Sequence, residues 1–284
     1  MSWRVIGFKK QKDLFDGLIK QGSLSHAYIF QGPEQIGKKL FAQDVFAKAN
    51  QKKEFNSVDP DLLVIGPRLA EDETKIYIED IRDLKTFLSL RSYYESYRFV
   101  IIDDAHRLTT EASNALLKLL EEPVAKVIFI LVTSQPQELL QTISSRAQHV
   151  NFLPHVDKVV EEAISNSKLS KPDQALAVAL AHGRIGWAIN AMQTGVFRDI
   201  KQSVEEFSEI LKSPLAERMI FAKRLFEKQP YQEEVNYWLA WAYANRSTLH
   251  NAHHVLSQLL VLHQYINQPQ YNHRALLENT LINL

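Results

Sequence analysis

Residues 27–38 place a phosphate-binding loop between a strand and a helix, and this feature constrains the fold more than any other. The short apolar run at residues 27–30 leads into Gly32, and Gly37 and Lys38 complete the G-x-x-x-x-G-K order before a helical pattern begins. In such a loop the glycines let backbone N–H groups surround a phosphate, and the helix N-terminus adds positive potential. The sequence therefore predicts a P-loop.

The residue after the P-loop lysine departs from the pattern of a nucleotide hydrolase. That position normally carries Ser or Thr, whose hydroxyl holds Mg²⁺, and here it is Lys39. An ammonium group has only donors and cannot ligate a cation. We therefore interpret the loop as a degenerate nucleotide site with impaired metal chemistry. We expect no cofactor to be required, and we expect the vestigial ATP site to be weak or empty.

Composition bounds the class of protein. A length of 284 residues is typical of two domains of ordinary size, and 45% hydrophobic residues supply a core. The absence of cysteine excludes disulfides, thiol catalysis and thiolate zinc sites. We expect a cytoplasmic protein without a membrane segment, because no apolar run approaches spanning length. The net charge of +0 predicts that any contact with DNA is local or shared with partners.

Strand and helix signals alternate up to about residue 152. Expected strands cover residues 27–30, 62–65, 99–102, 127–132 and 148–152, and expected helices cover residues 37–49, 79–90, 109–121 and 135–143. The apolar runs are continuous rather than alternating, which indicates strands buried on both faces. This pattern predicts an α/β domain with a mostly parallel sheet under helices.

After Pro154 the strand signals stop. Residues 156–193 indicate small helices that break near residues 170–172, at Gly183 and at Gly186, and the pattern is helical from residue 196 onward. Two side-chain groups in this part have ordinary explanations. Aromatic residues so close together on a helix are more often core or subunit interface than a base-stacking platform, and three histidines without a carboxylate beside them are more often a helix face than a metal site. These groups are Trp238, Trp241 and Tyr243, and His250, His253 and His254.

A second nucleotide signal follows the apolar run at residues 99–102, which ends in Asp103 and Asp104. This order resembles a Walker B element, in which the first acid holds the metal and the next is usually a Glu that activates water. Asp104 is one methylene shorter than Glu, and about an ångström of misplacement can lower a rate on the order of 100-fold. The alternative is that both acids cap the following turn. The P-loop upstream favours the Walker B interpretation.

The helix expected at residues 109–121 ends in acidic residues. Thr109 or Thr110 can cap its start, whereas Glu121 and Glu122 lie in the last turn, where negative charge opposes the helix dipole. Such an exception hints at a cationic partner, with a solvated helix end as the alternative.

Two further positions relate to phosphate chemistry. Thr133 or Ser134 follows the run at residues 127–132, where a polar residue can sense a γ-phosphate. Arg146 lies between a helix and the last expected strand, so we expect it at the edge of the domain. A lone arginine is otherwise a surface charge.

Residues 114–123, NALLKLLEEP, and residues 134–152, SQPQELLQTISSRAQHVNF, resemble the bacterial clamp-loader branch of the AAA+ proteins. The resemblance is greatest to the delta-prime subunits of DNA polymerase III, and it covers about the first two-thirds of the chain. It implies an AAA+ domain with a P-loop NTPase-like parallel sheet at residues 1–154. A small helical lid at residues 155–194 and an all-α collar domain at residues 195–284 would follow.

The resemblance also implies roles for individual residues. In this family a Ser-Arg-Cys motif supplies an arginine finger to ATP in the neighbouring subunit, and here Ser145-Arg146-Ala147 keeps the arginine. ATP-hydrolysing members carry a sensor arginine in the lid, and Gly186 falls at that position. Many members also carry a four-cysteine zinc module, which this cysteine-free chain is expected to lack. We therefore expect no structural metal.

The resemblance implies a stator subunit that donates Arg146 in trans and helps an ATP-driven complex load the sliding clamp on primed DNA. Its expected partners are gamma/tau-like motor and delta-like subunits, with the clamp and DNA reached through the complex. Lys39, Asp104 and Gly186 together predict no meaningful ATPase activity, and we expect no polymerase activity of the chain itself. Two alternatives are an ATP-hydrolysing motor subunit of the same loader and a non-replicative AAA+ adaptor or scaffold.

Overall fold

The computed structural model describes residues 2–52, 55–56, 58–70, 73–89, 97–122, 125–167, 169–228 and 231–284. The chain forms two compact units. The first contains Met1–His155 and Arg184–Gly186, and the second contains Val156–Gly183 and Trp187–Leu284. The division into three domains at residues 154 and 194 stays a prediction.

Five parallel strands form the main sheet of the first unit. Their order is β2-β5-β6-β1-β7, and each neighbouring pair is parallel. The strands are β1 (Ala27–Gln31), β2 (Leu62–Ile65), β5 (Arg98–Ile102), β6 (Val127–Thr133) and β7 (Gln148–Asn151). Gln31 lies opposite Thr133, and Ile102 lies opposite Leu131. The carboxyl ends of β1, β5 and β6 therefore meet at one edge of the sheet.

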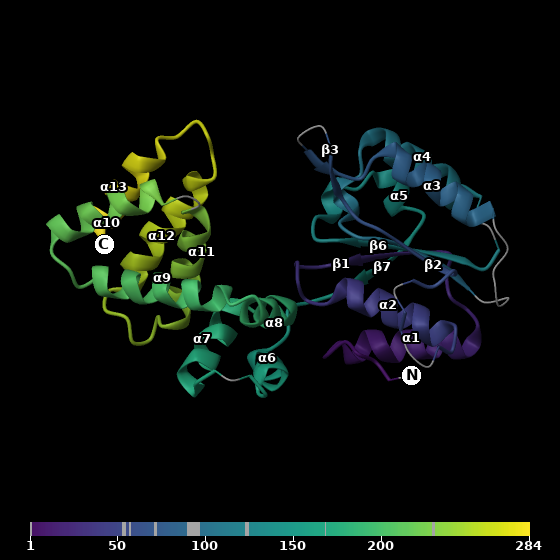
Figure 1. The fold of residues 1–284 in the computed structure, drawn as a ribbon, viewed down its shortest axis with the longest axis horizontal. Coiled ribbons are helices and arrows are strands. Elements are labelled where there is room, and N and C mark those ends of the chain that lie inside the picture. Colours follow the sequence, from purple (N-terminus) through teal and green to yellow (C-terminus); the bar gives the residue numbers. More distant parts are fainter. Residues whose placement is uncertain are drawn as a thin grey trace. The chain divides into compact units, whose positions relative to one another are not determined.

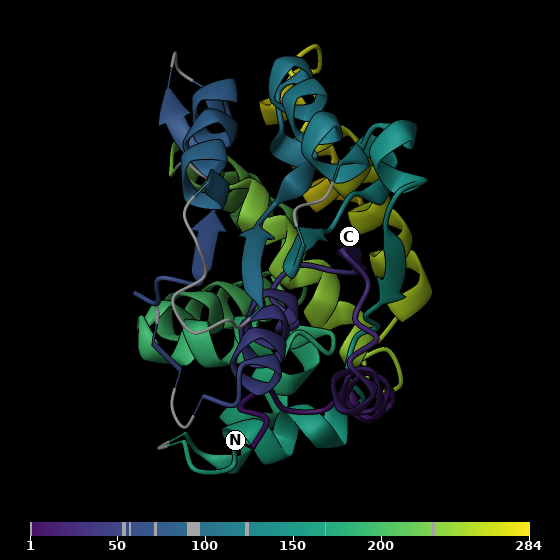
Figure 2. The same cartoon turned by 90° about the vertical axis from the view of Figure 1, so that its right-hand side faces the viewer.

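Helices cover both faces of this sheet (Figure 1), and the same layers are visible after a quarter turn (Figure 2). One face carries α1 (Lys9–Gln21) and α2 (Lys38–Ala49), and the other carries α3 (Ile78–Ser89), α4 (Thr110–Glu121) and α5 (Gln141–Ser144). Alternate residues of β1 serve the two cores: Phe30 packs against Phe15 and Phe41 in one core, whereas Ile29 belongs to the other. The predicted burial on both faces is confirmed for β1, β5 and β6. It is wrong for the edge strand β7, in which only Val150 is buried, and β2 is buried only at its two ends.

The N-terminal segment is tied to α2 by a buried carboxylate. Asp44 accepts hydrogen bonds from the backbone N–H and the Nε of Arg4, at 2.7 and 2.6 Å, and from the backbone N–H of Val5 at 2.9 Å. Its side chain is almost fully buried, so the charge is stabilised by these donors rather than by water.

Two parts of the first unit differ from the sequence-based expectation. The single helix expected at residues 135–143 is wrong: a 3₁₀ turn, η2 (Pro136–Glu138), and α5 are separated by Leu139 and Leu140 in extended backbone. This break lets Leu139 pack into the core beneath α4. Neither α1 nor the hairpin of β3 (Arg68–Ala70) and β4 (Glu73–Lys75) was expected. The helix expected at residues 79–90 corresponds to α3, and Leu90 lies outside the described residues.

The second unit is helical throughout its described residues, as expected. Its helices are α6 (Asp157–Ile164), α7 (Lys171–Ala181), α8 (Ile185–Gln193), α9 (Val196–Ile210), α10 (Leu215–Glu227), α11 (Gln232–Ala244), α12 (Ala252–Ile266) and α13 (His273–Asn283). The first two residues of α8, Ile185 and Gly186, belong to the first unit. The expected break at Gly186 is wrong, because this residue lies in the first turn of α8. Trp238 is a core residue: it stacks on Phe207 with ring centroids 4.5 Å apart. Within the described part of the chain, no helix has the length and apolar character needed to cross a membrane.

Candidate functional site

The P-loop connects β1 to α2 at the edge where the strands end. Gly32 has φ 151°, and a Cβ there would lie 2.1 Å from the carbonyl oxygen of Phe152. Gly37 has φ 104° immediately before α2. Both positions have left-handed backbone that side chains rarely adopt. The backbone N–H of Gly32 donates to the carbonyl of Thr133 at 3.2 Å, which fixes the loop to the end of β6.

Lys38 closes the loop on itself. Its Nζ donates to the carbonyl oxygens of Gly32 and Pro33 at 2.6 and 2.5 Å, and the side chain is buried. Burial lowers the pKa of Lys38, while the carboxylates of Asp104, Asp103 and Glu34 oppose this shift. The ammonium that would meet a phosphate in a nucleotide hydrolase is satisfied here by carbonyls of its own loop.

Lys39 pairs with the first acid of the Walker B-like element. Its Nζ lies 3.0 Å from Oδ2 of Asp103, and the two side chains are 47% and 22% exposed. The fold implies Mg²⁺ between these two positions, because the residue after the P-loop lysine and the Walker B acid hold it in P-loop hydrolases. The residues present do not fit this ion, since an ammonium already neutralises the carboxylate that would face it.

Asp104 follows at the start of the 3₁₀ turn η1 (Ala105–Arg107), with left-handed backbone at φ 48° and ψ 47°. Its side chain makes no hydrogen bond that caps this turn, so its carboxylate gives no support to the capping alternative. Burial raises the pKa of Asp104, and the nearby carboxylate of Asp103 raises it further. A raised pKa is the result of placing two carboxylates together in a partly desolvated site.

The two hydroxyls expected to sense a phosphate are engaged within the protein. Oγ1 of Thr133 accepts a hydrogen bond from the backbone N–H of Gln135 at 3.0 Å and lies 3.3 Å from Nδ1 of His106. The Ser134 hydroxyl donates to Glu34 at 3.2 Å. Sequence reasoning missed Glu34 and His106, because neither occupies a motif position. The other ring nitrogen of His106 is buried without a hydrogen-bond partner.

Gly186 touches the P-loop directly. Its backbone N–H donates to the carbonyl oxygen of Gln35 at 2.7 Å, and a Cβ would lie 2.5 Å from the same oxygen. Any larger residue at this position would have to displace loop backbone. Close packing therefore requires glycine at the position where ATP-hydrolysing members of the family carry a sensor arginine.

Arg146 lies between α5 and β7, one of the two edge strands of the sheet. One terminal nitrogen lies 2.8 Å from Oε1 of Glu121, and the other donates to the carbonyl of Thr142 at 2.9 Å. The side chain is 36% exposed. Glu121 is the last residue of α4, so Arg146 is the cationic partner that this acidic helix end indicated.

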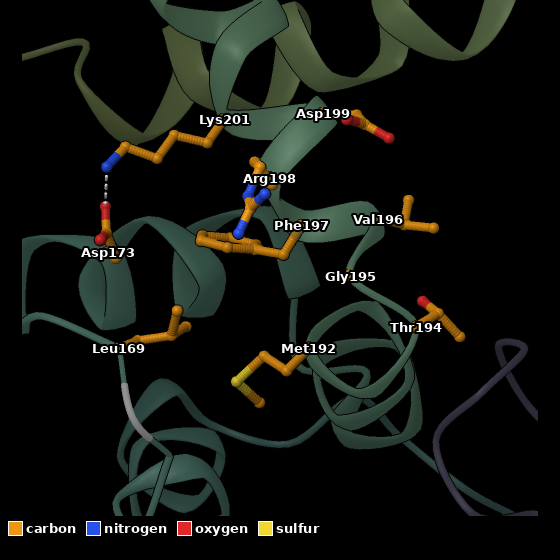
Figure 3. A pocket seen from close by; sticks show the side chains of 10 residues that line it. All are labelled: Leu169, Asp173, Met192, Thr194, Gly195, Val196, Phe197, Arg198, Asp199 and Lys201. Atoms are coloured by element: carbon orange, nitrogen blue, oxygen red, sulfur yellow. Dashed lines mark ion pairs between the residues drawn. The ribbon is translucent and has the colours of Figure 1, made fainter.

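The second unit contains a separate pocket of about 590 Å³. Leu169, Met192 and Phe197 contribute apolar side chains to it, and an ion pair of 2.7 Å joins Asp173 to Lys201 at its rim (Figure 3). None of the predicted site residues lines this pocket. Across the described ranges, no group of three or more His, Asp and Glu side chains is arranged to hold a metal; the predicted lack of a structural metal stays a prediction.

Comparisons with known proteins agree with the geometry of the first unit. The family model described as DNA polymerase III, delta subunit, matches residues 7–155. The chain is 30% identical over 230 residues to the DNA polymerase III subunit delta' of Pseudomonas aeruginosa, covering 73% of this chain and 69% of the relative. It is 28% identical over 233 residues to the delta' subunit of Bacillus subtilis, covering 76% and 69%. It is also 28% identical to the tau subunit of Bacillus subtilis, covering 73% of this chain and 38% of that relative.

A solved structure extends the likeness to the whole fold. The DNA polymerase III gamma subunit-related protein of Thermotoga maritima superposes with a TM-score of 0.52 at 19% identity, covering 94% of this chain and 97% of that one. At this identity the match concerns the fold alone, and it supports the AAA+ architecture. The chain belongs to the delta-prime family of DNA polymerase III subunits, in the clamp-loader branch of the AAA+ proteins.

Proposed function

We propose that this chain is a non-hydrolysing stator subunit of a bacterial clamp loader that donates Arg146 to ATP bound by a neighbouring motor subunit. The observation that carries the proposal is a contrast within the first unit. The chain's own phosphate site is held by internal contacts of Lys38, Lys39 and Gly186. Arg146 instead takes its partners from α4 and α5, and it is partly exposed beside the edge strand.

The chemistry of the guanidinium suits this role. Phosphoryl transfer depends on stabilising charge on the transferring group, and an arginine finger can raise turnover by about 10³ to 10⁵ in GTPases. Arg presents a planar fork of donors that is always charged. Ala147 replaces the cysteine of the family motif and packs against the core beneath α4. The role of the finger depends on the guanidinium and is independent of that cysteine.

The ion pair with Glu121 does not oppose this function strongly. Both side chains are substantially exposed, and such pairs contribute only about 0.2–1 kcal/mol. A γ-phosphate at a subunit interface carries more charge than one carboxylate, so it can take the guanidinium from Glu121.

The proposed partners are gamma/tau-like and delta-like subunits, and through them the sliding clamp and primed DNA. The net charge of +0 fits a subunit that reaches DNA as part of an assembly. A motor role is disfavoured by the Lys39–Asp103 pair and by the contact of Gly186 with the P-loop. A non-replicative adaptor or scaffold is disfavoured by membership of the delta-prime family.

The test is a reconstituted loader that contains each variant of this subunit. Arg146→Ala should leave assembly intact, lower total ATPase activity only partly because other interfaces keep their fingers, and lower clamp loading more than it lowers binding. Arg146→Lys should fail similarly, since a point charge cannot replace the planar fork. Arg82→Ala is the matched control, because Arg82 is an exposed arginine of α3 with only a long ion pair. Full loading activity with Arg146→Ala would reduce this residue to a surface charge.

A further inference from the structure

We infer that the Lys39 ammonium is the resident cation of this P-loop, occupying the position where the AAA+ fold would otherwise hold a divalent metal. The inference starts from the 3.0 Å contact between Nζ of Lys39 and Oδ2 of Asp103. It is independent of the role proposed for Arg146.

The charges around the loop show why a cation is needed there. Three carboxylates, those of Glu34, Asp103 and Asp104, act electrostatically on the same lysine, Lys38. The ammonium of Lys38 is already bound to two loop carbonyls. Without Lys39, Asp103 would lie beside Asp104 with no cation at ion-pair distance among the described contacts.

The position of Lys39 in the chain makes this cation permanent. It lies in the first turn of α2, directly after Lys38, and its side chain reaches the end of β5. A metal at this point in a hydrolase arrives and leaves with the nucleotide, whereas an ammonium on a side chain cannot leave. The cation beside Asp103 is therefore supplied by the chain itself, with or without nucleotide.

A permanent ammonium also excludes a metal from the same place. At about 4 Å, two unit charges repel by about 1 kcal/mol even in bulk water, and a divalent ion doubles this term. Removing the ammonium should therefore tighten the binding of a divalent cation near Asp103 by at least about tenfold. Mg²⁺ and Mn²⁺ are commonly held by one or two carboxylates and several waters, so Asp103 and its neighbour suffice for weak binding in such a variant.

The experiment uses the full chain and the metal alone. Mn²⁺ is titrated into wild type, Lys39→Thr and Lys39→Arg, with free Mn²⁺ followed by electron paramagnetic resonance, and the melting temperature is measured with and without millimolar Mg²⁺. Lys39→Thr should bind Mn²⁺ at least about tenfold more tightly than wild type and should gain melting temperature from Mg²⁺. Wild type and Lys39→Arg should show neither effect.

Two further variants control for charge and for location. Lys48→Thr removes the same charge from the same helix, where Lys48 pairs with Asp16 at 3.1 Å, and should gain no response to metal. Adding Asp103→Asn to Lys39→Thr should abolish the response. The inference is wrong if wild type binds Mn²⁺ as tightly as Lys39→Thr, if Lys39→Thr binds no more tightly than Lys48→Thr, or if the double variant keeps its binding.

Discussion

Replacing Glu121 with Gln should release Arg146 from its ion pair and strengthen its engagement with nucleotide in the neighbouring subunit. The pair is short, at 2.8 Å, but the two side chains are 36% and 49% exposed. Exposed ion pairs of this kind contribute about 0.2–1 kcal/mol. The phosphate would no longer have to displace this carboxylate. The apparent affinity for ATP at that interface should therefore rise by about 1.4-fold to fivefold.

The assay is an ATP titration of DNA-stimulated hydrolysis in a reconstituted loader that carries Glu121→Gln in this subunit. Glu122→Gln is the matched control, because it removes the same charge one residue further on, where the structure places no ion pair with Arg146. The difference between the two variants should shrink as salt is raised, since exposed charges are screened. The carbonyl of Thr142 remains as the second anchor of the guanidinium.

A specific result would refute this reasoning. If Glu121→Gln lowers ATP affinity or turnover in the way expected for Arg146→Ala, Glu121 positions the finger and does not compete for it. If the variant is indistinguishable from Glu122→Gln at low salt, the ion pair has no role in the assembled loader.

Three further predictions concern the chain by itself. Gly186→Arg should lower the melting temperature and restore no ATPase activity, because its Cβ would lie 2.5 Å from a P-loop carbonyl; a stable, hydrolysing variant would contradict this. The pKa of Asp104 is raised above its ordinary 3.8, so this carboxyl favours folding when protonated, and that contribution is lost as pH rises through the raised pKa. Asp104→Asn should therefore increase the free energy of unfolding at pH 7, and this gain should fade at a pH below the ordinary pKa of 3.8. Urea titrations at pH 7 and at such a low pH measure the difference, and a loss of stability at pH 7 would count against the prediction. Asp44→Ala should reduce stability by about 1–3 kcal/mol, because it leaves the buried backbone N–H of Val5 and the partly buried N–H of Arg4 without an acceptor. Asp16→Ala removes the exposed carboxylate that pairs with Lys48 and should change the free energy of unfolding by no more than about 1 kcal/mol. Equal losses in the Asp44 and Asp16 variants would refute the argument that burial makes Asp44 the more important carboxylate.

Local pattern alone was enough to predict the elements of the first unit that carry the site. The sequence runs predicted the bounds of the five strands within a residue or two. For β1, β5 and β6 the reason is that a strand buried on both faces can contain almost no polar side chains. The spacing of Gly32, Gly37 and Lys38 predicted the loop, because left-handed backbone is a local property of glycine. The helix wrongly expected at residues 135–143 shows the limit of local pattern. Its middle is extended at Leu139 and Leu140, because the Leu139 side chain packs into the core beneath α4.

The sequence by itself determined which chemical groups the site contains and which one it lacks: a P-loop lysine, two strand-end acids, an edge arginine, and Lys39 in place of a metal-binding hydroxyl. Only the tertiary structure decided how these groups are paired. Lys39 meets Asp103, Arg146 meets Glu121, and Gly186 meets Gln35. The members of each pair lie on different elements, and the distance between them depends on the order of the strands and the packing of the helices. No periodicity along the chain encodes such distances, because they are set when buried surfaces far apart in the sequence pack together.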